Sequence, residues 1–193
     1  IFHFVLQMEQ EKKVILLAGP TASGKSKLAL QLAKNLNGEI INADSMQVYN
    51  QIFILTSRPN SQDTNIVKHH LYGFNSVKQK FSTGHWLKMV SNKIKEQWNQ
   101  DRIPILVGGT GLYFKALTDG LVKIPDIPNN LRTEIRKLHK KIGQKNFFNQ
   151  LIKMDPLAKR FVLPSDAQRS MRAYEVKKFT KKSLFQFTKK TKP

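Results

Sequence analysis

The chain contains no cysteine, and this absence limits the kinds of protein it can be. A disulfide framework and a metal site built on thiolates are both excluded. The lack of cysteine is compatible with a reducing compartment, so we expect a cytoplasmic protein. The sequence also lacks any run of about 18 apolar residues, which is the length that a membrane-spanning helix needs. We therefore expect a soluble protein without a membrane partner.

Acidic residues are scarce as well: 13 of them stand against 33 lysines and arginines, and the formal net charge is +20. Residues 1–120 hold 14 basic and 8 acidic residues (+6), whereas residues 121–193 hold 19 basic and 5 acidic residues (+14). A polyanionic partner such as a nucleic acid would explain this excess, and so would a genome of low G+C content that favours lysine codons. The length of 193 residues suffices for one domain with a sizeable core and a small additional segment.

The most informative stretch is residues 14–26, where an apolar run is followed by a glycine-rich turn and then by a helical pattern. The turn reads Gly19-Pro20-Thr21-Ala22-Ser23-Gly24-Lys25-Ser26, which fits the phosphate-loop pattern G-x-x-x-x-G-K-S. A strand before the turn and an amphipathic helix after it are the context that a phosphate loop requires. Backbone N–H groups of the turn and of the helix start would bind a diphosphate. Lys25 is expected to contact the terminal phosphate oxygens, and Ser26 is expected to ligate Mg²⁺.

Two further predicted strands end near the same site. Residues 39–43 form the second strand and run into Asp44, a candidate general base or water-mediated magnesium ligand, with a helix N-cap as the alternative role. Residues 104–107 form the third strand, and the turn that contains Thr110 follows it. Because the carboxyl ends of parallel strands share one edge of a sheet, we expect Asp44 and Thr110 beside the phosphate loop. The sequence thus predicts an α/β fold with a parallel sheet of three strands and flanking helices.

Residues 85–100 carry apolar side chains at helical spacing and are predicted to form a crossover helix that packs on the sheet. The pair His69-His70 is predicted to be packed or hydrogen bonded, because adjacent histidines point to different faces of most elements and no metal-ligand spacing accompanies them. Glycine and prolines in residues 119–128 predict a domain boundary. We therefore expect a core of residues 1–120 with the diphosphate site, followed by a basic helical segment, residues 121–193.

Five blocks of residues, taken in order, resemble the tRNA dimethylallyltransferase family. They are residues 19–26, Asn42-Ala43-Asp44-Ser45-Met46-Gln47-Val48-Tyr49, His69-His70-Leu71, Val107-Gly108-Gly109-Thr110-Gly111-Leu112-Tyr113 and, in the basic segment, residues 169–176. Together they span nearly the whole chain, which makes the resemblance far more specific than the phosphate loop alone. It implies a P-loop NTPase-like fold with a helical insertion domain.

The resemblance implies transfer of a dimethylallyl group from dimethylallyl diphosphate to N6 of adenosine 37, beside the tRNA anticodon, with Mg²⁺ and release of diphosphate. In this family the phosphate loop holds the diphosphate of the prenyl donor, although such loops are often described as ATP-binding. Asp44 is then the catalytic base, while Lys25 and Thr110 stabilise the leaving diphosphate. The acceptor base has to be extruded from the anticodon loop to reach them. The positions that match the family's tRNA contacts are Asp44, Ser45, Met46, Gln47, Thr110, Arg132, Gln168, Arg169, Ser170, Met171 and Arg172.

The chain departs from the family pattern at three places. Asn50-Gln51 stands where Arg-Gly is usual, residues 54–59 replace I-G-T-A-K-P, and Gly73 replaces an acidic residue. Members of the family continue past the position of Pro193, so we expect a C-terminally truncated chain that lacks a further core strand; its start is expected at Ile1 or Met8. We expect a monomer. Two alternatives stay open, which are a truncated remnant that only binds RNA and a small-molecule or nucleotide kinase.

Overall fold

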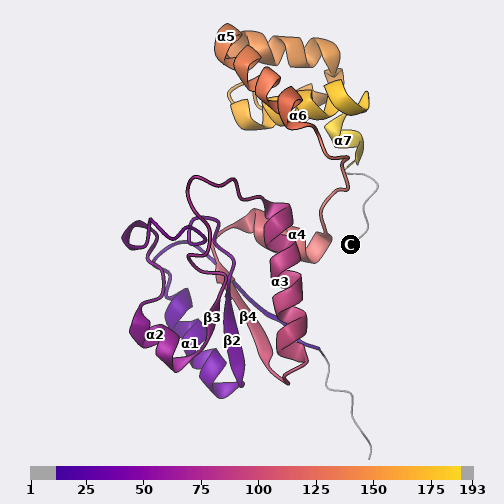
Figure 1. Ribbon diagram of the computed structural model, residues 1–193. Helices are drawn as coiled ribbons and strands as arrows, with labels where there is room; N and C mark the ends of the chain where they lie inside the picture. The colour runs from indigo at the N-terminus through magenta and orange to yellow at the C-terminus, as the bar shows by residue number, and fades with distance from the viewer. Residues whose placement is uncertain (1–11, 188–193) are drawn as a thin grey trace, which may run out of the picture. The chain divides into compact units, whose positions relative to one another are not determined.

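The computed structural model describes residues 12–187, and two compact units divide this part of the chain, one ending at Asp119 and the other beginning at Gly120. The first unit alternates strands with helices (Figure 1). Its elements in order are β1 (Ile15–Ala18), α1 (Lys25–Asn35), β2 (Gly38–Asn42), η1 (Ile54–Thr56), α2 (Ser61–Ile66), β3 (His69–His70), α3 (Thr83–Trp98), β4 (Ile103–Gly108) and α4 (Gly111–Asp119). The expected chain start at Ile1 or Met8 lies outside the described residues.

The sheet has the order β1-β4-β2-β3, and every neighbouring pair is parallel. The predicted parallel α/β sheet is therefore confirmed, but the expectation of three strands was wrong. The fourth strand, β3, consists of His69 and His70, which pair with Ile40 and Ile41. Two polar residues give no alternating apolar pattern, so the sequence carries no signal for this strand.

Alternate residues of the central strands face opposite layers of the sheet. Ile40 and Ile105 pack against α1. Ile41 and Leu106, one residue further along each strand, pack against α3 and α4. This alternation follows from the two-residue period of a β-strand, and it buries β2 and β4 on both faces. The crossover helix predicted at residues 85–100 is confirmed as α3, whose Trp86 is fully buried.

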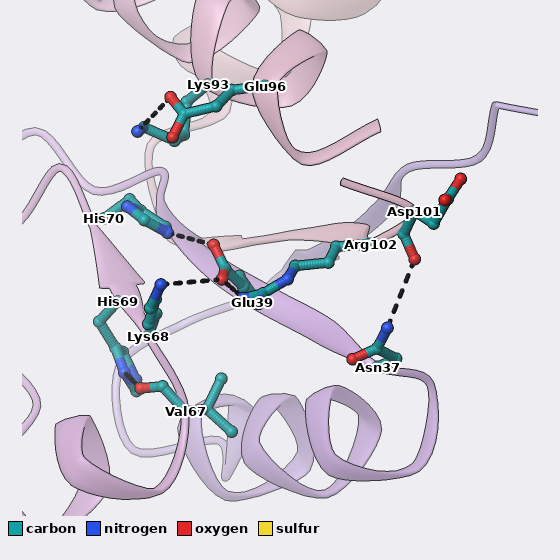
Figure 2. A network of polar contacts seen from close by, with 10 residues as sticks. All are labelled: Asn37, Glu39, Val67, Lys68, His69, His70, Lys93, Glu96, Asp101 and Arg102. Atoms are coloured by element: carbon teal, nitrogen blue, oxygen red, sulfur yellow. Dashed lines mark hydrogen bonds and ion pairs between the residues drawn. The ribbon is translucent and has the colours of Figure 1, made fainter. Parts of the chain in front are cut away.

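A polar network surrounds Glu39 at the edge of the sheet where β2 begins (Figure 2). Glu39 is only 4% exposed, and its carboxylate forms an ion pair with Arg102, the residue before β4. The same carboxylate lies 2.6 Å from Nε2 of His70 and 4.0 Å from Nζ of Lys68. Nδ1 of His69 lies 2.8 Å from the Val67 carbonyl oxygen, so both histidines are hydrogen bonded, as predicted. The network ties β2, β3 and the start of β4 together.

The second unit contains α5 (Asn129–Met154), η2 (Pro156–Arg160), α6 (Ala167–Thr180) and α7 (Leu184–Phe187). Gly143 interrupts α5 with φ 76° and ψ 163°, values that are outside the helical region. A core of Leu151, Ala158, Val162, Ala173 and Phe185 holds these helices together. Within residues 12–187, no helix combines the length and the apolar character that crossing a membrane requires.

Candidate active site at the carboxyl edge of the sheet

The phosphate-loop residues 19–26 connect β1 to α1. Ala22 and Gly24 have positive φ angles of 62° and 81°, which turn the chain sharply before the helix. No side chain caps α1 at Gly24, so the N–H groups of its first turn are available to an anion. Thr21 to Gly24 are exposed, as is Ser26 in the first helical turn.

Lys25 lies over the loop itself. Its ammonium donates to the Pro20 carbonyl and to the Ser23 hydroxyl, the latter at 3.2 Å. The Ser23 hydroxyl in turn donates to the Pro20 carbonyl at 2.8 Å. A Cβ atom on Gly19 would lie 3.3 Å from the Ser23 oxygen, so glycine leaves room for this arrangement. The loop thus presents one flexible cation and free backbone donors, which is the chemistry that binds phosphate.

Gly108, the last residue of β4, and Gly109 bring three loops together. A Cβ atom on Gly108 would overlap with the carbonyl carbon and oxygen of Ala43, so only glycine allows the ends of β2 and β4 to come this close. A Cβ atom on Gly109 would lie 3.4 Å from the Gly19 oxygen and 3.7 Å from Oδ2 of Asp44. The phosphate loop and the Asp44 carboxylate are therefore within van der Waals distance of the same point.

Asp44 is hydrogen bonded to the residues two positions before and two positions after it in the sequence, Asn42 and Met46. Its N–H donates to Oδ1 of the buried Asn42 at 2.8 Å, and the Asn42 amide donates to the Asp44 carbonyl at 2.9 Å. Oδ1 of the Asp44 carboxylate accepts from the Met46 N–H at 2.8 Å. Oδ2 has no hydrogen-bond partner among residues 12–187. No helix begins here, so the alternative role as a helix N-cap is wrong, and Asp44 keeps one carboxylate oxygen for chemistry.

Thr110 holds the residue that follows Asp44. Its hydroxyl accepts from the Ser45 N–H at 2.8 Å and donates to the Ser45 hydroxyl at 3.2 Å. Its own N–H donates to the Ala43 carbonyl at 3.3 Å. The hydroxyl of Thr110 is thus directed to the segment that carries Asp44, so this geometry fits a positioning role.

Two tyrosines that pack on opposite faces of the sheet, Tyr113 and Tyr72, both interact electrostatically with the Asp44 carboxylate. Burial raises the pKa of Tyr113 to about 12, and Tyr49 and the Asp44 carboxylate add to this effect. The Tyr113 ring stacks on Trp86 with centroids 4.1 Å apart. Burial, followed by the charge of Asp44, also raises the pKa of Tyr72. The sequence predicted no role for these tyrosines or for Asn42. The signal for Asn42 is its place as a polar residue at the end of an apolar strand.

The remaining predicted contacts in the first unit differ in exposure. Met46 is 53% exposed. The Gln47 amide donates to the carbonyls of Thr56, at 2.7 Å, and Ser57, at 3.3 Å. Gln47 is therefore tied to the chain around η1, whereas Met46 is open to a partner.

The other predicted tRNA contacts belong to the second unit. Gln168 and Arg169 are exposed in the first turn of α6, and Arg172 lies 3.5 Å from Glu175. Ser170 is fully buried, and its hydroxyl donates to the Asp166 carbonyl at 2.6 Å. Met171 and Arg132 are half-buried. Among the predicted positions in this unit, the polar side chains that are exposed or half-buried, and so can meet a ligand, are those of Gln168, Arg169, Arg172 and Arg132.

A parallel sheet, a glycine-rich loop between β1 and α1 and a carboxylate after β2 define an α/β protein with a P-loop NTPase-like fold. The family model described as IPP transferase matches residues 47–193. A tRNA dimethylallyltransferase of Pelagibacter ubique (strain HTCC1062) is 54% identical over 185 residues, which cover 96% of this chain and 59% of the relative. One of Rickettsia massiliae (strain Mtu5) is 48% identical, covering 92% of this chain and 49% of the relative. The chain belongs to the IPP transferase family, which confirms the resemblance seen in its sequence.

Solved structures agree with this assignment. A eukaryotic dimethylallyltransferase acting on tRNA superposes with a TM-score of 0.78 at 30% identity, covering 92% of this chain and 44% of the other. A tRNA isopentenylpyrophosphate transferase from Bacillus halodurans gives a TM-score of 0.58 at 35% identity, covering 88% of this chain and 56% of the other. The chain spans about half the length of the curated relatives it matches.

Proposed function

We propose that the protein transfers a dimethylallyl group from dimethylallyl diphosphate to N6 of adenosine 37 in tRNA, beside the anticodon. The names of its relatives support this function, since the Pelagibacter and Rickettsia proteins are tRNA dimethylallyltransferases. The observation that carries the proposal is the meeting of the phosphate loop and the Asp44 carboxylate at Gly109. A site for a leaving diphosphate thus lies beside a candidate base.

The diphosphate is the group that the phosphate loop would hold. Cleavage of the C1–O bond leaves the bonding electrons on the diphosphate, whose negative charge therefore increases in the transition state. The first-turn N–H groups of α1 and the Lys25 ammonium would stabilise that charge. Lys25 would exchange its bonds to Pro20 and Ser23 for charge-assisted bonds to phosphate oxygens.

Asp44 would take the proton that N6 loses as the new C–N bond forms. The exocyclic amine of adenine is a poor nucleophile because its lone pair is delocalised into the ring, so loss of the proton helps the reaction. Oδ1 is fixed by the Met46 N–H, which leaves Oδ2 to accept the proton. Thr110 fixes the adjacent Ser45 backbone and so limits movement of the carboxylate.

Mg²⁺ fits this site as a partner of the diphosphate. Within residues 12–187, no group of three or more His, Cys, Asp or Glu side chains could hold a metal ion by itself. The Ser26 hydroxyl in the first turn of α1 is an oxygen ligand of the kind that Mg²⁺ takes together with phosphate oxygens and water. When bound, the ion would neutralise part of the charge on the diphosphate.

The basic second segment would bind the anticodon stem-loop. Its net charge of +14 would attract the phosphate backbone. The exposed side chains of Gln168 and Arg169, together with Arg172 and Arg132, are the candidates for direct contact. Ser170, which is buried, would support the helix from inside. Met46 would make an apolar contact to RNA from the first unit.

The test is incubation of the protein with dimethylallyl diphosphate, Mg²⁺ and an anticodon stem-loop RNA, followed by mass spectrometry of the RNA. We expect a mass gain of one dimethylallyl group, and none with the Lys25→Ala variant. Binding of the RNA without any mass gain, under conditions in which a full-length relative succeeds, would support the RNA-binding remnant instead. Turnover of ATP that depends on a small acceptor and on Lys25 would support a kinase.

A further inference from the structure

A half-buried arginine, Arg58, contacts the turn of residues 46–49, which follows Asp44. Its Nη1 donates to the Tyr49 carbonyl at 3.1 Å, and its guanidinium carbon lies 4.8 Å from the centroid of the Phe53 ring. Among the described residues, no carboxylate is within ion-pair distance of it. The guanidinium thus contacts the backbone and an aromatic ring, which hold it in one place without an ion pair.

The position of Arg58 depends on a glycine. Gly73 has a φ of +55°, and a Cβ atom there would overlap with Nη1 and Cζ of Arg58. The Gly73 N–H donates to the Gln47 carbonyl at 2.9 Å. Gly73 therefore holds the turn at Gln47 and, by having no side chain, admits the guanidinium that holds the same turn at Tyr49.

Hydrogen bonds connect Arg58 to the candidate base. Arg58 donates to the Tyr49 carbonyl, and the Tyr49 N–H donates to the Met46 carbonyl at 3.4 Å. The Met46 N–H donates to Oδ1 of Asp44 at 2.8 Å. One end of the four-residue turn is thus tied to Arg58 and the other end to the carboxylate.

We propose that Arg58 is a positioning residue for Asp44, and that it acts by fixing the turn of residues 46–49. The inference rests on the proposed function, because it concerns the orientation of the base in that reaction. Asn75 also holds this turn, because its N–H donates to the Val48 carbonyl and its carbonyl accepts from the Asn50 N–H, both at 2.9 Å. Without the guanidinium, the Tyr49 carbonyl loses its side-chain donor, and the Met46 N–H holds Oδ1 less firmly. The phosphate loop lies outside this chain of hydrogen bonds, so binding of the prenyl donor does not depend on Arg58.

The test compares Arg58→Met, which keeps much of the side-chain length without donors, with Arg58→Lys, which keeps the charge and a donor. Lys88→Met is the control, because Lys88 is an exposed lysine of α3. We expect Arg58→Met to lower the single-turnover transfer rate about tenfold, the effect of losing one charge-assisted hydrogen bond, with no change in the Kd for dimethylallyl diphosphate. Arg58→Lys should recover part of the rate, and Lys88→Met should keep the wild-type rate.

A second arm uses amide hydrogen exchange by NMR and needs no activity. Arg58→Met is expected to speed exchange at the Met46 and Tyr49 amides about tenfold. Gly73→Ala should also speed exchange at these amides, because its Cβ displaces the guanidinium. Unchanged exchange at both amides in Arg58→Met would overturn the proposal. If wild-type protein transfers nothing, the proposed function fails, and the exchange data still decide whether Arg58 fixes the turn.

Discussion

Replacing Glu39 with glutamine should destabilise the α/β unit by about 2 kcal/mol. Glutamine keeps the shape of the side chain and an oxygen that can accept from His70, so the substitution removes little except the charge. Burial, with the nearby Lys93 ammonium, lowers the pKa of His70, which is therefore neutral at pH 7 and donates through Nε2. The Arg102 guanidinium then loses its one carboxylate partner among the described residues.

The magnitude follows from the exposure of the two partners. Unit charges about 4 Å apart attract each other by about 4 kcal/mol at an effective dielectric constant of about 20. The side chain of Glu39 is 5% exposed, whereas that of Arg102 is 33% exposed, so water screens one side of the pair. Removing the buried charge also removes its desolvation cost. About half of the attraction is therefore lost as stability, which corresponds to a decrease in Tm of about 10 °C for a unit of this size.

The assay is thermal unfolding followed by tryptophan fluorescence. Both tryptophans, Trp86 and Trp98, belong to α3, so the signal reports the α/β unit alone. Glu96→Gln is the matched control, because Glu96 also pairs with a cation, Lys93 at 2.5 Å, but is 51% exposed. That variant should unfold near the wild-type temperature. Equal Tm values for Glu39→Gln and wild type would refute the assignment of a stabilising role to this network.

Three further predictions concern the site and the residues around it. Gly108→Ala should lower the free energy of unfolding by about 3 kcal/mol, because the added Cβ meets the Ala43 backbone, which cannot rotate away. Gly111→Ala should be tolerated, since nothing lies within 4 Å of that position. Chemical denaturation measures both variants. Above pH 10 the ionisation of Tyr113 should lower the stability of the wild type by up to about 3 kcal/mol, because the pKa of Tyr113 is about 12 in the folded protein and about 10 in the unfolded chain. This contribution is complete below pH 10 and disappears as the pH approaches 12. Tyr113→Phe should make the profile shallower, and the remaining decrease is due to Tyr72, whose pKa is also raised; an unchanged profile would contradict the assignment. Asp44→Asn should lower the single-turnover transfer rate by about 10²–10⁴ while RNA affinity stays within twofold, as measured by quenched-flow and fluorescence anisotropy; a rate within threefold of wild type would exclude Asp44 as the base.

The parts of the fold that were predicted have strong local signals. The phosphate loop combines two glycines, a lysine and a serine at fixed spacing with a strand before it and a helix after it. β2 and β4 are apolar runs that end in polar or glycine residues, so their carboxyl ends could be placed at one edge of the sheet. These features need no knowledge of the tertiary structure, because each of them is encoded within a few neighbouring residues.

What could not be predicted depends on contacts between distant residues. β3 exists because His69 and His70 pair with β2, and their side chains are satisfied by Val67 and Glu39. In the same way, the helical pattern that includes Ser170 gives no indication that its hydroxyl is buried against Asp166. Local periodicity reports which face of an element is apolar, but it does not report which polar groups find a partner far along the chain.

Residues at the two ends of β2 have different roles, one in stability and the other in the proposed chemistry. Glu39 near its start is buried in a network of charges and anchors neighbouring strands, whereas Asp44, two residues beyond its end, keeps Oδ2 without a partner in the described part of the chain. The strand between them is packed on both faces and joined to β4 through the close approach at Gly108. Because a strand that is packed on both faces moves little, the sheet fixes the location of the Asp44 carboxylate, and the turn after β2 fixes its orientation. Substitution of Glu39 should therefore change stability while leaving the chemistry of the folded fraction intact, and substitution of Asp44 should do the reverse.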